Sequence, residues 1–259
     1  MTTASERATT WLNEFDAALK SGNVGAVTAL FDDDCYWRDL VSFTWNIKTM
    51  EGKAQIADML NTTMKLIRSL EHKKDRREAG LFMAEGLAML DRAEALGWVP
   101  DYLVATKPQA IFDGMKSTIV TDKVMTELSG QNNPHDVLGV FKQKYQPHPT
   151  KEGVWLALEE IRDPGNLGTI LRTADAVDVT GVILVGDSCD PYSPESVRAS
   201  TGSIFGVTLV RMTREGLMDL AKAWDGEVVG TASTAKHSFR RVYKSPTLLL
   251  MGNESRGLT

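Results

Sequence analysis

Two apolar runs on either side of one amphipathic segment constrain the fold of this chain more than any other feature. The runs are VWLALEEI, residues 154–161, and GVILVG, residues 181–186. Both are hydrophobic almost throughout, as parallel strands are when helices cover both faces of their sheet. In the segment between them, the i, i+3, i+4 and i+7 positions of a buried helix stripe are held by Leu167, Ile170, Leu171 and Ala174. A strand, a helix and a second strand in this order predict an α/β fold with a parallel sheet.

Two later segments predict further strands of this sheet and mark its functional edge. EVVGTAS, residues 227–233, and TLLLMG, residues 247–252, are strand-like runs that end in small residues. Strands of a parallel sheet deliver ligand contacts at their C-terminal ends. We therefore expect a cofactor to bind at the GTAS turn and at the MGNE turn, residues 251–254.

Residues 61–145 predict a second, smaller α/β domain. A basic helix beginning near Met64 leads into a short strand at LFMAE and a second helix. Three β-rich runs, DYLVAT, STIVT and VLGVFKQ, follow with short helical stretches between them. QPHPTKEG, residues 146–153, has two prolines, a glycine and no periodicity, and we interpret it as a linker to the catalytic region at residues 154–259.

The first 60 residues predict a separate α+β segment. A helix is expected over residues 5–21 and a short one over VGAVTALF, followed by a strand or hairpin in DDDCYWRDLVSFTWNI and a helix in EGKAQIADML. The aromatic residues of this segment favour a local hydrophobic core over a ligand-binding site.

Composition indicates a folded globular protein, with 42% hydrophobic and 24% charged residues. The two cysteines, Cys35 and Cys189, have no CxxC spacing, which excludes a disulfide scaffold or a structural zinc site. The N-terminus lacks the blocks of a signal peptide, and no apolar run approaches the ~20 residues that span a bilayer, so we expect a cytoplasmic protein without a membrane partner.

The net charge of −5 does not exclude a nucleic-acid partner, because it is unevenly distributed. Residues 1–63 hold 5 Lys and Arg against 9 Asp and Glu, whereas the other 196 residues hold 24 against 25. Local patches decide nucleic-acid binding more than the total does.

Three stretches resemble one enzyme family. RDPGNLGTILRTADA, with Asn166 and Arg172, is similar to the first signature of the SpoU/TrmH family of RNA ribose methyltransferases. LLLMGNESRGLT resembles its second signature, a strand followed by Gly-x-Glu-x-x-Gly, here Gly252, Asn253, Glu254 and Gly257. LIRSLEHKKDRREAGLFMAEG looks like the family's N-terminal substrate-binding domain. The resemblance covers residues 61–259.

The resemblance implies a SPOUT-type sheet with a trefoil knot, in which S-adenosylmethionine donates a methyl group to a ribose 2′-hydroxyl of RNA. Ribosomal RNA is the substrate expected at family level, with transfer RNA as the alternative. Family members are homodimers. Carried over residue by residue, the cofactor-binding positions are Thr231, Ala232, Ser233, Met251, Gly252, Asn253 and Gly257.

The catalytic residues implied are Arg172, Asn166 and Glu254. The sulfonium methyl is already activated, so the protein mainly aligns the attacking oxygen. The family assigns proton removal to the arginine, but a guanidinium with a pKa above ~12 is a poor base. We expect Arg172 to stabilise the developing alkoxide and orient the adjacent phosphate. Asn166 would fix the loop before the helix, and Glu254 would hold the turn.

Each of these residues also has a purely structural interpretation. Arg172 could be a solvated helix residue, Asn166 a helix N-cap, and Glu254 an exposed turn residue. The matched spacing and order favour the functional roles. Two interpretations of the basic run stand equal: its side chains contact RNA phosphates, or they form a solvated helix face. The run consists of Lys73, Lys74, Arg76 and Arg77. The four histidines show no catalytic or metal-binding spacing.

Both ends of the chain depart from the family pattern. LFDDDCYWRDLVSFTW and MEGKAQIADML resemble the opening half of a SnoaL-like cone fold, without its later strands. The third SpoU signature, a Ser-x-Asn turn and closing helix, has no match before residue 259. We therefore expect residues 1–259 to form an incomplete knot, with weak or absent cofactor binding and activity.

Two other function classes remain open from the sequence. One is a non-catalytic RNA-binding scaffold, which would retain RNA without methylating it. The other is a SnoaL-like ligand-binding or dimerising module at the N-terminus.

Overall fold

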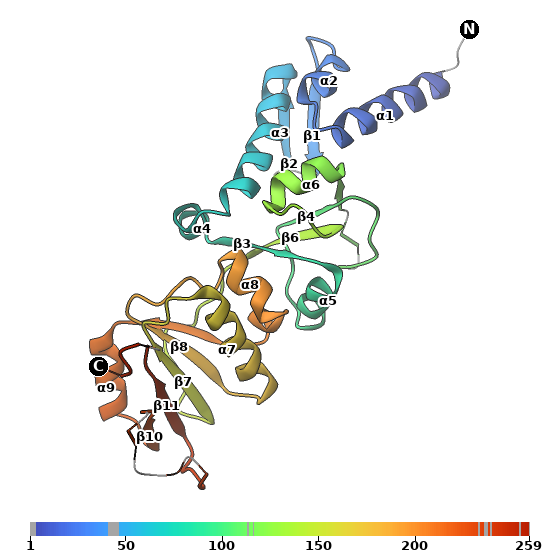
Figure 1. Cartoon of the computed structure of the whole chain (residues 1–259). Coiled ribbons are helices and arrows are strands. Elements are labelled where there is room, and N and C mark those ends of the chain that lie inside the picture. The colour runs from blue at the N-terminus through green and yellow to red at the C-terminus, as the bar shows by residue number, and fades with distance from the viewer. Residues whose placement is uncertain are drawn as a thin grey trace. The chain divides into compact units, whose positions relative to one another are not determined.

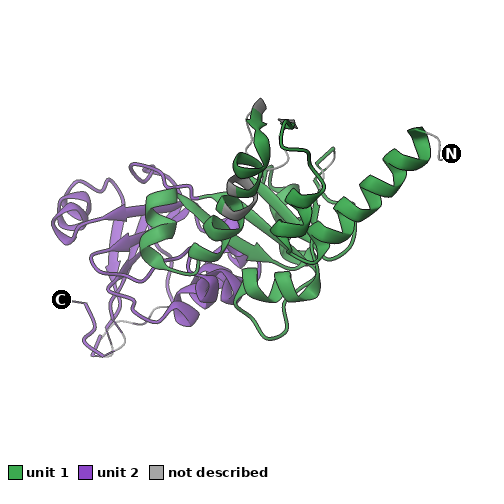
Figure 2. Cartoon of the chain, turned by 90° about the horizontal axis from the view of Figure 1, so that it is seen from above, with its two compact units in different colours: residues 1–142 green, residues 143–259 purple. Residues whose placement is uncertain are grey.

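The computed structural model describes residues 4–40, 47–112, 114–115, 117–232, 234–235, 238, 240–253 and 255–258. The chain divides into two compact units, residues 1–142 and 143–259, which Figure 2 colours separately. In the described part of the chain, no helix is long and apolar enough to cross a membrane.

The second unit contains a five-stranded sheet whose strand order is β10-β11-β7-β8-β9. All four neighbouring pairs are parallel, which confirms the predicted sheet. The strands are β7 (Val154–Glu159), β8 (Gly181–Val185), β9 (Leu209–Met212), β10 (Glu227–Gly230) and β11 (Thr247–Met251). The last strand therefore lies inside the sheet, between β10 and β7 (Figure 1). Strand β9 was not among the strands predicted from the sequence.

Helices cover both faces of this sheet. On one face, α9 (Arg214–Lys222) and the following Trp224 pack against a core that includes Trp155, Ile183 and Leu248. The other face is covered by α7 (Pro164–Ala176) and α8 (Pro194–Ser200), which is followed by the 3₁₀ turn Ser203–Phe205 (Figure 1). Because strand side chains alternate between the two faces, continuous apolar strands such as β8 need this double cover.

A glycine sets the contact between α7 and α8. The predicted buried stripe of α7 is confirmed at Leu167, Leu171 and Ala174, and Gly168 completes it, whereas Ile170 is only half-buried. A Cβ on Gly168 would lie 2.5 Å from both the Ala199 Cβ and the Ser196 carbonyl oxygen. The two helices therefore approach backbone to backbone.

The first unit contains a four-stranded sheet with the order β3-β6-β4-β5. Its strands are β3 (Leu81–Glu85), β4 (Tyr102–Ala105), β5 (Thr118–Ile119) and β6 (Val137–Lys142). Its helices are α3 (Gly52–Ser69), α4 (Lys73–Ala79), α5 (Leu87–Ala95) and α6 (Asp122–Ser129). Ile67, Leu70 and Leu128 belong to the core between the sheet and the α3 and α6 helices. The predicted small α/β arrangement is confirmed.

The N-terminal elements are α1 (Ala4–Lys20), α2 (Val24–Ala29), and the antiparallel pair β1 (Tyr36–Leu40) and β2 (Ile47–Glu51). Trp11, Phe15, Phe31 and Trp37 form a local aromatic cluster with neighbouring ring centroids 5.1–6.0 Å apart. This agrees with the local core expected from the sequence. Helix α3 runs without a break through residue 60, where we had expected a domain boundary. The SnoaL-like origin of this segment and the four-part division of the chain stay predictions.

Candidate active site

The carboxyl ends of β7, β10 and β11 meet at one edge of the parallel sheet, where two turns are joined by hydrogen bonds. Thr231, directly after β10, donates from its backbone N–H and its hydroxyl to the carbonyl oxygen of Leu250, at 3.0 and 3.1 Å. The side chain of Thr231 and the following Ala232 are exposed. This edge therefore places the two turns predicted to hold a cofactor side by side.

The turn after β11 folds back on itself and depends on two glycines. Asn253 and Gly257 exchange backbone hydrogen bonds at 3.1 and 2.8 Å. A Cβ on Gly252 would lie 2.0 Å from the carbonyl carbon of Gly257 and 2.2 Å from the nitrogen of Leu258, so no side chain fits. Gly257 has φ +73°, a left-handed conformation that favours glycine. We call this segment, residues 252–258, the glycine turn.

Asn253 fastens the glycine turn to the end of β7. Its Nδ2 donates to the carbonyl oxygen of Glu160 at 2.8 Å, and its Oδ1 accepts from the N–H and hydroxyl of Ser255 at 2.9 and 2.6 Å. The side chain of Asn253 is thus engaged within the protein. The side chain holds the turn in shape, and the predicted part of Asn253 in cofactor binding stays a prediction.

Carboxylates at the end of β7 organise three arginines at this edge. The buried Glu159 carboxylate lies 3.2 Å from Nε of Arg214. Glu160 accepts ion pairs from Arg162 and Arg256 at 3.4 and 3.8 Å, and both guanidiniums are more than half exposed. Exposed pairs of this kind contribute little to stability, and the arginines can exchange partners with an anionic ligand. No sequence pattern predicted this set, although Glu159 and Glu160 lie near the end of a predicted strand.

The two described catalytic candidates lie on α7. Asn166 is exposed near the start of the helix, and its backbone N–H donates to Oδ1 of Asp163 at 2.6 Å. The N-cap is therefore Asp163, which corrects the alternative interpretation of Asn166 as the cap. Arg172 is exposed, and no hydrogen bond or ion pair joins its guanidinium to another described residue. Ser233 and Glu254, the remaining predicted site residues of this edge, lie outside the described residues.

The loop after β8 packs against the same end of β7 and contributes no nucleophile. The N–H of Cys189 donates to the Ile161 carbonyl oxygen at 2.7 Å, and the buried Ser188 hydroxyl donates to Leu158 and Val185. Burial raises the pKa of the Cys189 thiol to about 11. The thiol is therefore protonated at neutral pH, which argues against covalent catalysis by this cysteine.

The predicted RNA-contacting residues separate into an exposed set and a buried one. Lys73, Lys74 and Arg77 are exposed on α4. Arg76 is only 3% exposed, and its Nη1 donates to the carbonyl oxygens of Leu70 and Glu71 at 2.8 and 2.7 Å. Arg76 closes the C-terminal end of α3, so its assignment as a phosphate contact is corrected. Within the described ranges, no group of three or more His, Cys, Asp or Glu residues could hold a metal ion.

Comparison with known proteins gives two family matches. Residues 153–259 match the SpoU rRNA Methylase family, and residues 61–139 match the MRM3-like substrate binding domain. Residues 1–60 lie outside both matches.

Individual relatives align with most of the chain. A 23S rRNA (uridine(2479)-2′-O)-methyltransferase of Streptomyces viridochromogenes is 30% identical over 218 residues, which cover 73% of this chain and 74% of the relative. The 23S rRNA (guanosine(2553)-2′-O)-methyltransferase RlmP of Bacillus subtilis is 27% identical, with 79% of this chain and 84% of the relative covered. The crystal structure of an AdoMet-bound rRNA methyltransferase from Sinorhizobium meliloti superposes with a TM-score of 0.68 at 40% identity, covering 77% of this chain and 80% of that one.

Proposed function

Because this chain belongs to the SpoU family of rRNA methylases, we propose that it transfers a methyl group from S-adenosylmethionine to a ribose 2′-hydroxyl of ribosomal RNA. The family predicted from the sequence is confirmed. The glycine turn, hydrogen-bonded to the end of β7 and lying beside the turn after β10, is the observation that carries the proposal. The relatives from Streptomyces and Bacillus act on 23S rRNA, which supports the same substrate class here.

The residues at this edge fit the cofactor. When bound, S-adenosylmethionine supplies a methyl group that is already activated by the sulfonium charge. Thr231, Ala232 and Met251 would contact it, because they end neighbouring strands and are exposed or half-buried. Gly252 and Gly257 leave no Cβ on the glycine turn, so its backbone can approach a ligand closely. Asn253 holds this backbone in place through the Glu160 carbonyl.

Arg172 supplies an exposed guanidinium cation, which has several N–H donors and no acceptor. Such a group stabilises the oxyanion that forms as the 2′-hydroxyl loses its proton, and it orients a neighbouring phosphate. The family resemblance implies a homodimer, and we include it in the proposal, with Arg172 of one copy serving the glycine turn of the other.

Methyl transfer from tritiated S-adenosylmethionine to a 23S rRNA transcript tests the proposal. We expect Arg172→Ala to lower kcat about 100- to 1000-fold, because it removes one oxyanion-stabilising donor. Cofactor affinity, measured by calorimetry, should be unchanged. Lys222→Ala, an exposed cation on α9, is the control and should leave both quantities unchanged. RNA retention without methyl incorporation by the unaltered chain would contradict the enzyme and favour the non-catalytic scaffold.

Mixed dimers test the shared site. In a C2 dimer, co-expressed Arg172→Ala and Gly252→Ala chains form heterodimers with one intact composite site, so about a quarter of the normal activity should return. Activity no greater than that of the separate variants would assign Arg172 to the glycine turn of its own chain.

A further inference from the structure

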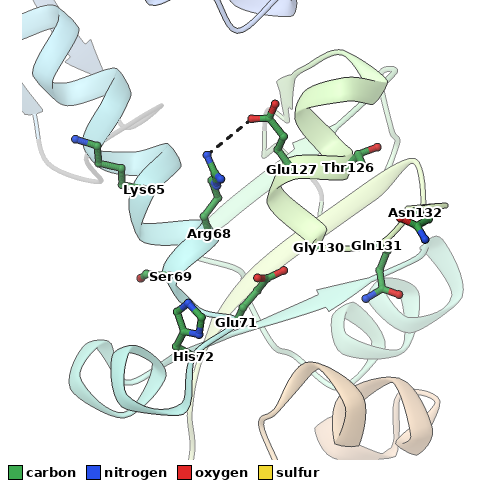
Figure 3. Close-up of a pocket in the computed structure, with 10 residues that line it drawn as sticks. All are labelled: Lys65, Arg68, Ser69, Glu71, His72, Thr126, Glu127, Gly130, Gln131 and Asn132. Atoms are coloured by element: carbon green, nitrogen blue, oxygen red, sulfur yellow. Dashed lines mark ion pairs between the residues drawn. The ribbon is translucent and has the colours of Figure 1, made fainter.

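The first unit has a polar cavity of about 530 Å³ between the end of α3, the turn into α4 and the end of α6. Figure 3 shows Arg68 reaching from α3 toward Glu127 on α6, with Glu71 extending toward Gly130 and His72 beside it. Its volume lies in the range of small-molecule sites. The cavity falls within the residues that match the MRM3-like substrate binding domain.

The Glu71 carboxylate is the distinctive group of this cavity. A Cβ on Gly130 would lie 1.5 Å from Oε1 of Glu71, so the carboxylate occupies space that only glycine leaves open. Gly130 also has φ +66° as the C-cap of α6. No ion pair joins Glu71 to another described residue. Glu127, by contrast, has Arg68 at 3.8 Å across the cavity.

The lining is balanced in charge and therefore differs from a simple phosphate site. Lys65 and Arg68 carry two positive charges, and Glu71 and Glu127 carry two negative ones. A nucleotide matches this mixture, because its phosphate needs cations and its base edge needs hydrogen-bond partners of both kinds. The amides of Gln131 and Asn132 add further donors and acceptors at the rim.

We propose that this cavity holds one unpaired guanine of the RNA substrate, with the Glu71 carboxylate accepting hydrogen bonds from its N1–H and N2–H groups. Guanine is the one common base with two adjacent donors on its Watson–Crick edge, which match the two oxygens of a carboxylate. Adenine, cytosine and uracil each place an acceptor beside the donor. The imidazole of His72 offers a ring on which an unpaired base can stack, and Arg68 and Lys65 line the same cavity and carry the positive charge that flanking phosphates need. The inference rests on the proposed function in taking RNA as the ligand.

Fluorescence polarisation with labelled hexaribonucleotides tests the inference on the full chain. The probes are UUGUUU, UUAUUU and UUIUUU, in which inosine lacks the N2 amino group. We expect the guanine probe to bind about tenfold more tightly than the adenine probe, since a bidentate pair discriminates against a base with the wrong edge. Inosine should bind with intermediate affinity.

Glu71→Gln should abolish the guanine preference, because an amide has only one acceptor oxygen. Glu78→Gln is the matched control, since Glu78 is an exposed glutamate on α4 outside the cavity. Equal binding of the three probes by the unaltered chain would overturn the proposal, as would a guanine preference that survives in Glu71→Gln.

The methyl-transfer assay separates this result from the proposed function. A guanine preference that depends on Glu71 supports the cavity whether or not methylation is detected. Methylation without such a preference overturns the cavity proposal and leaves the enzyme standing.

Discussion

The glycine turn after β11 and the cavity beside α6 both depend on a glycine, and they use it in different ways. At Gly252 an added Cβ would meet the backbone of residues 257 and 258 at 2.0–2.2 Å. At Gly130 it would meet the tip of the Glu71 side chain at 1.5 Å. Backbone held by hydrogen bonds cannot move aside, whereas a side chain with rotatable bonds can. The glycine turn is therefore fixed by backbone contacts, and the cavity is fixed by side-chain contacts.

Because of this contrast, the two sites should differ in the amino-acid substitutions that they tolerate. A backbone-built turn presents the same surface whatever its side chains are, which suits a ligand that every family member shares. A site built from Glu71, His72 and Arg68 changes with single substitutions, which suits recognition of one RNA sequence. We expect a side chain at Gly252 of the glycine turn to remove activity, and mutations of the cavity to alter the choice of substrate.

Gly252→Ala should have the largest effect. The new methyl group forces the turn open and breaks the Asn253–Gly257 hydrogen bonds, so S-adenosylmethionine should bind about 100-fold more weakly in calorimetry. The free energy of unfolding should fall by about 1–3 kcal/mol, as expected for overpacking.

Gly257→Ala is the matched control within the same turn. Nothing lies within 4 Å of its Cβ position, so only the cost of φ +73° remains, about 1–2 kcal/mol. Cofactor affinity should change much less than in Gly252→Ala. Equal losses of affinity in the two variants would show that conformational strain, not steric exclusion, governs this turn.

Arg76→Ala should have the next largest effect. We expect it to lower the stability of the fold and not the affinity for RNA. The buried guanidinium closes α3 through two carbonyl oxygens, and hydrogen bonds from charged groups are worth about 1.5–3 kcal/mol. Urea unfolding measures the loss. Its neighbour Arg77 is exposed, so Arg77→Ala should change the free energy of unfolding by no more than ~0.5 kcal/mol. The same variant should reduce the slope of log K for RNA binding against log salt concentration by about one unit. Weaker RNA binding by Arg76→Ala at unchanged stability would restore Arg76 as a phosphate contact.

Local patterns predicted most elements of the fold. The runs that became β7 and β8 are apolar throughout, and the stripe of α7 has helical spacing, so neighbours in sequence were sufficient to identify them. Strand β9 was not predicted because it is only four residues long and includes the exposed Arg211. Strand order could not be predicted in this way, since placing β11 between β10 and β7 depends on pairing with residues about 90 positions earlier.

For the candidate site, the sequence predicted only the features that depend on backbone geometry. Gly252 and Gly257 are visible in sequence because glycine patterns report backbone geometry directly. The bond from Asn253 to Glu160 joins residues 93 positions apart, and no local pattern encodes it. Arg76 was misassigned because a run of cations looks solvated until the fold shows which one turns inward.

Gly130→Ala should have a smaller effect on stability than Arg76→Ala and isolates the role of the Glu71 carboxylate. Gly80 provides a close control, because it also has φ +66° as a helix C-cap and nothing lies within 4 Å of its Cβ position. Both alanine variants should lose about 1–2 kcal/mol of unfolding free energy from the left-handed backbone. Only Gly130→Ala should also lose the preference for the guanine hexamer, because its methyl group displaces Glu71. A preference kept by both variants would mean that the carboxylate recognises nothing at its present position. A preference lost by both would assign the effect to general destabilisation of the unit.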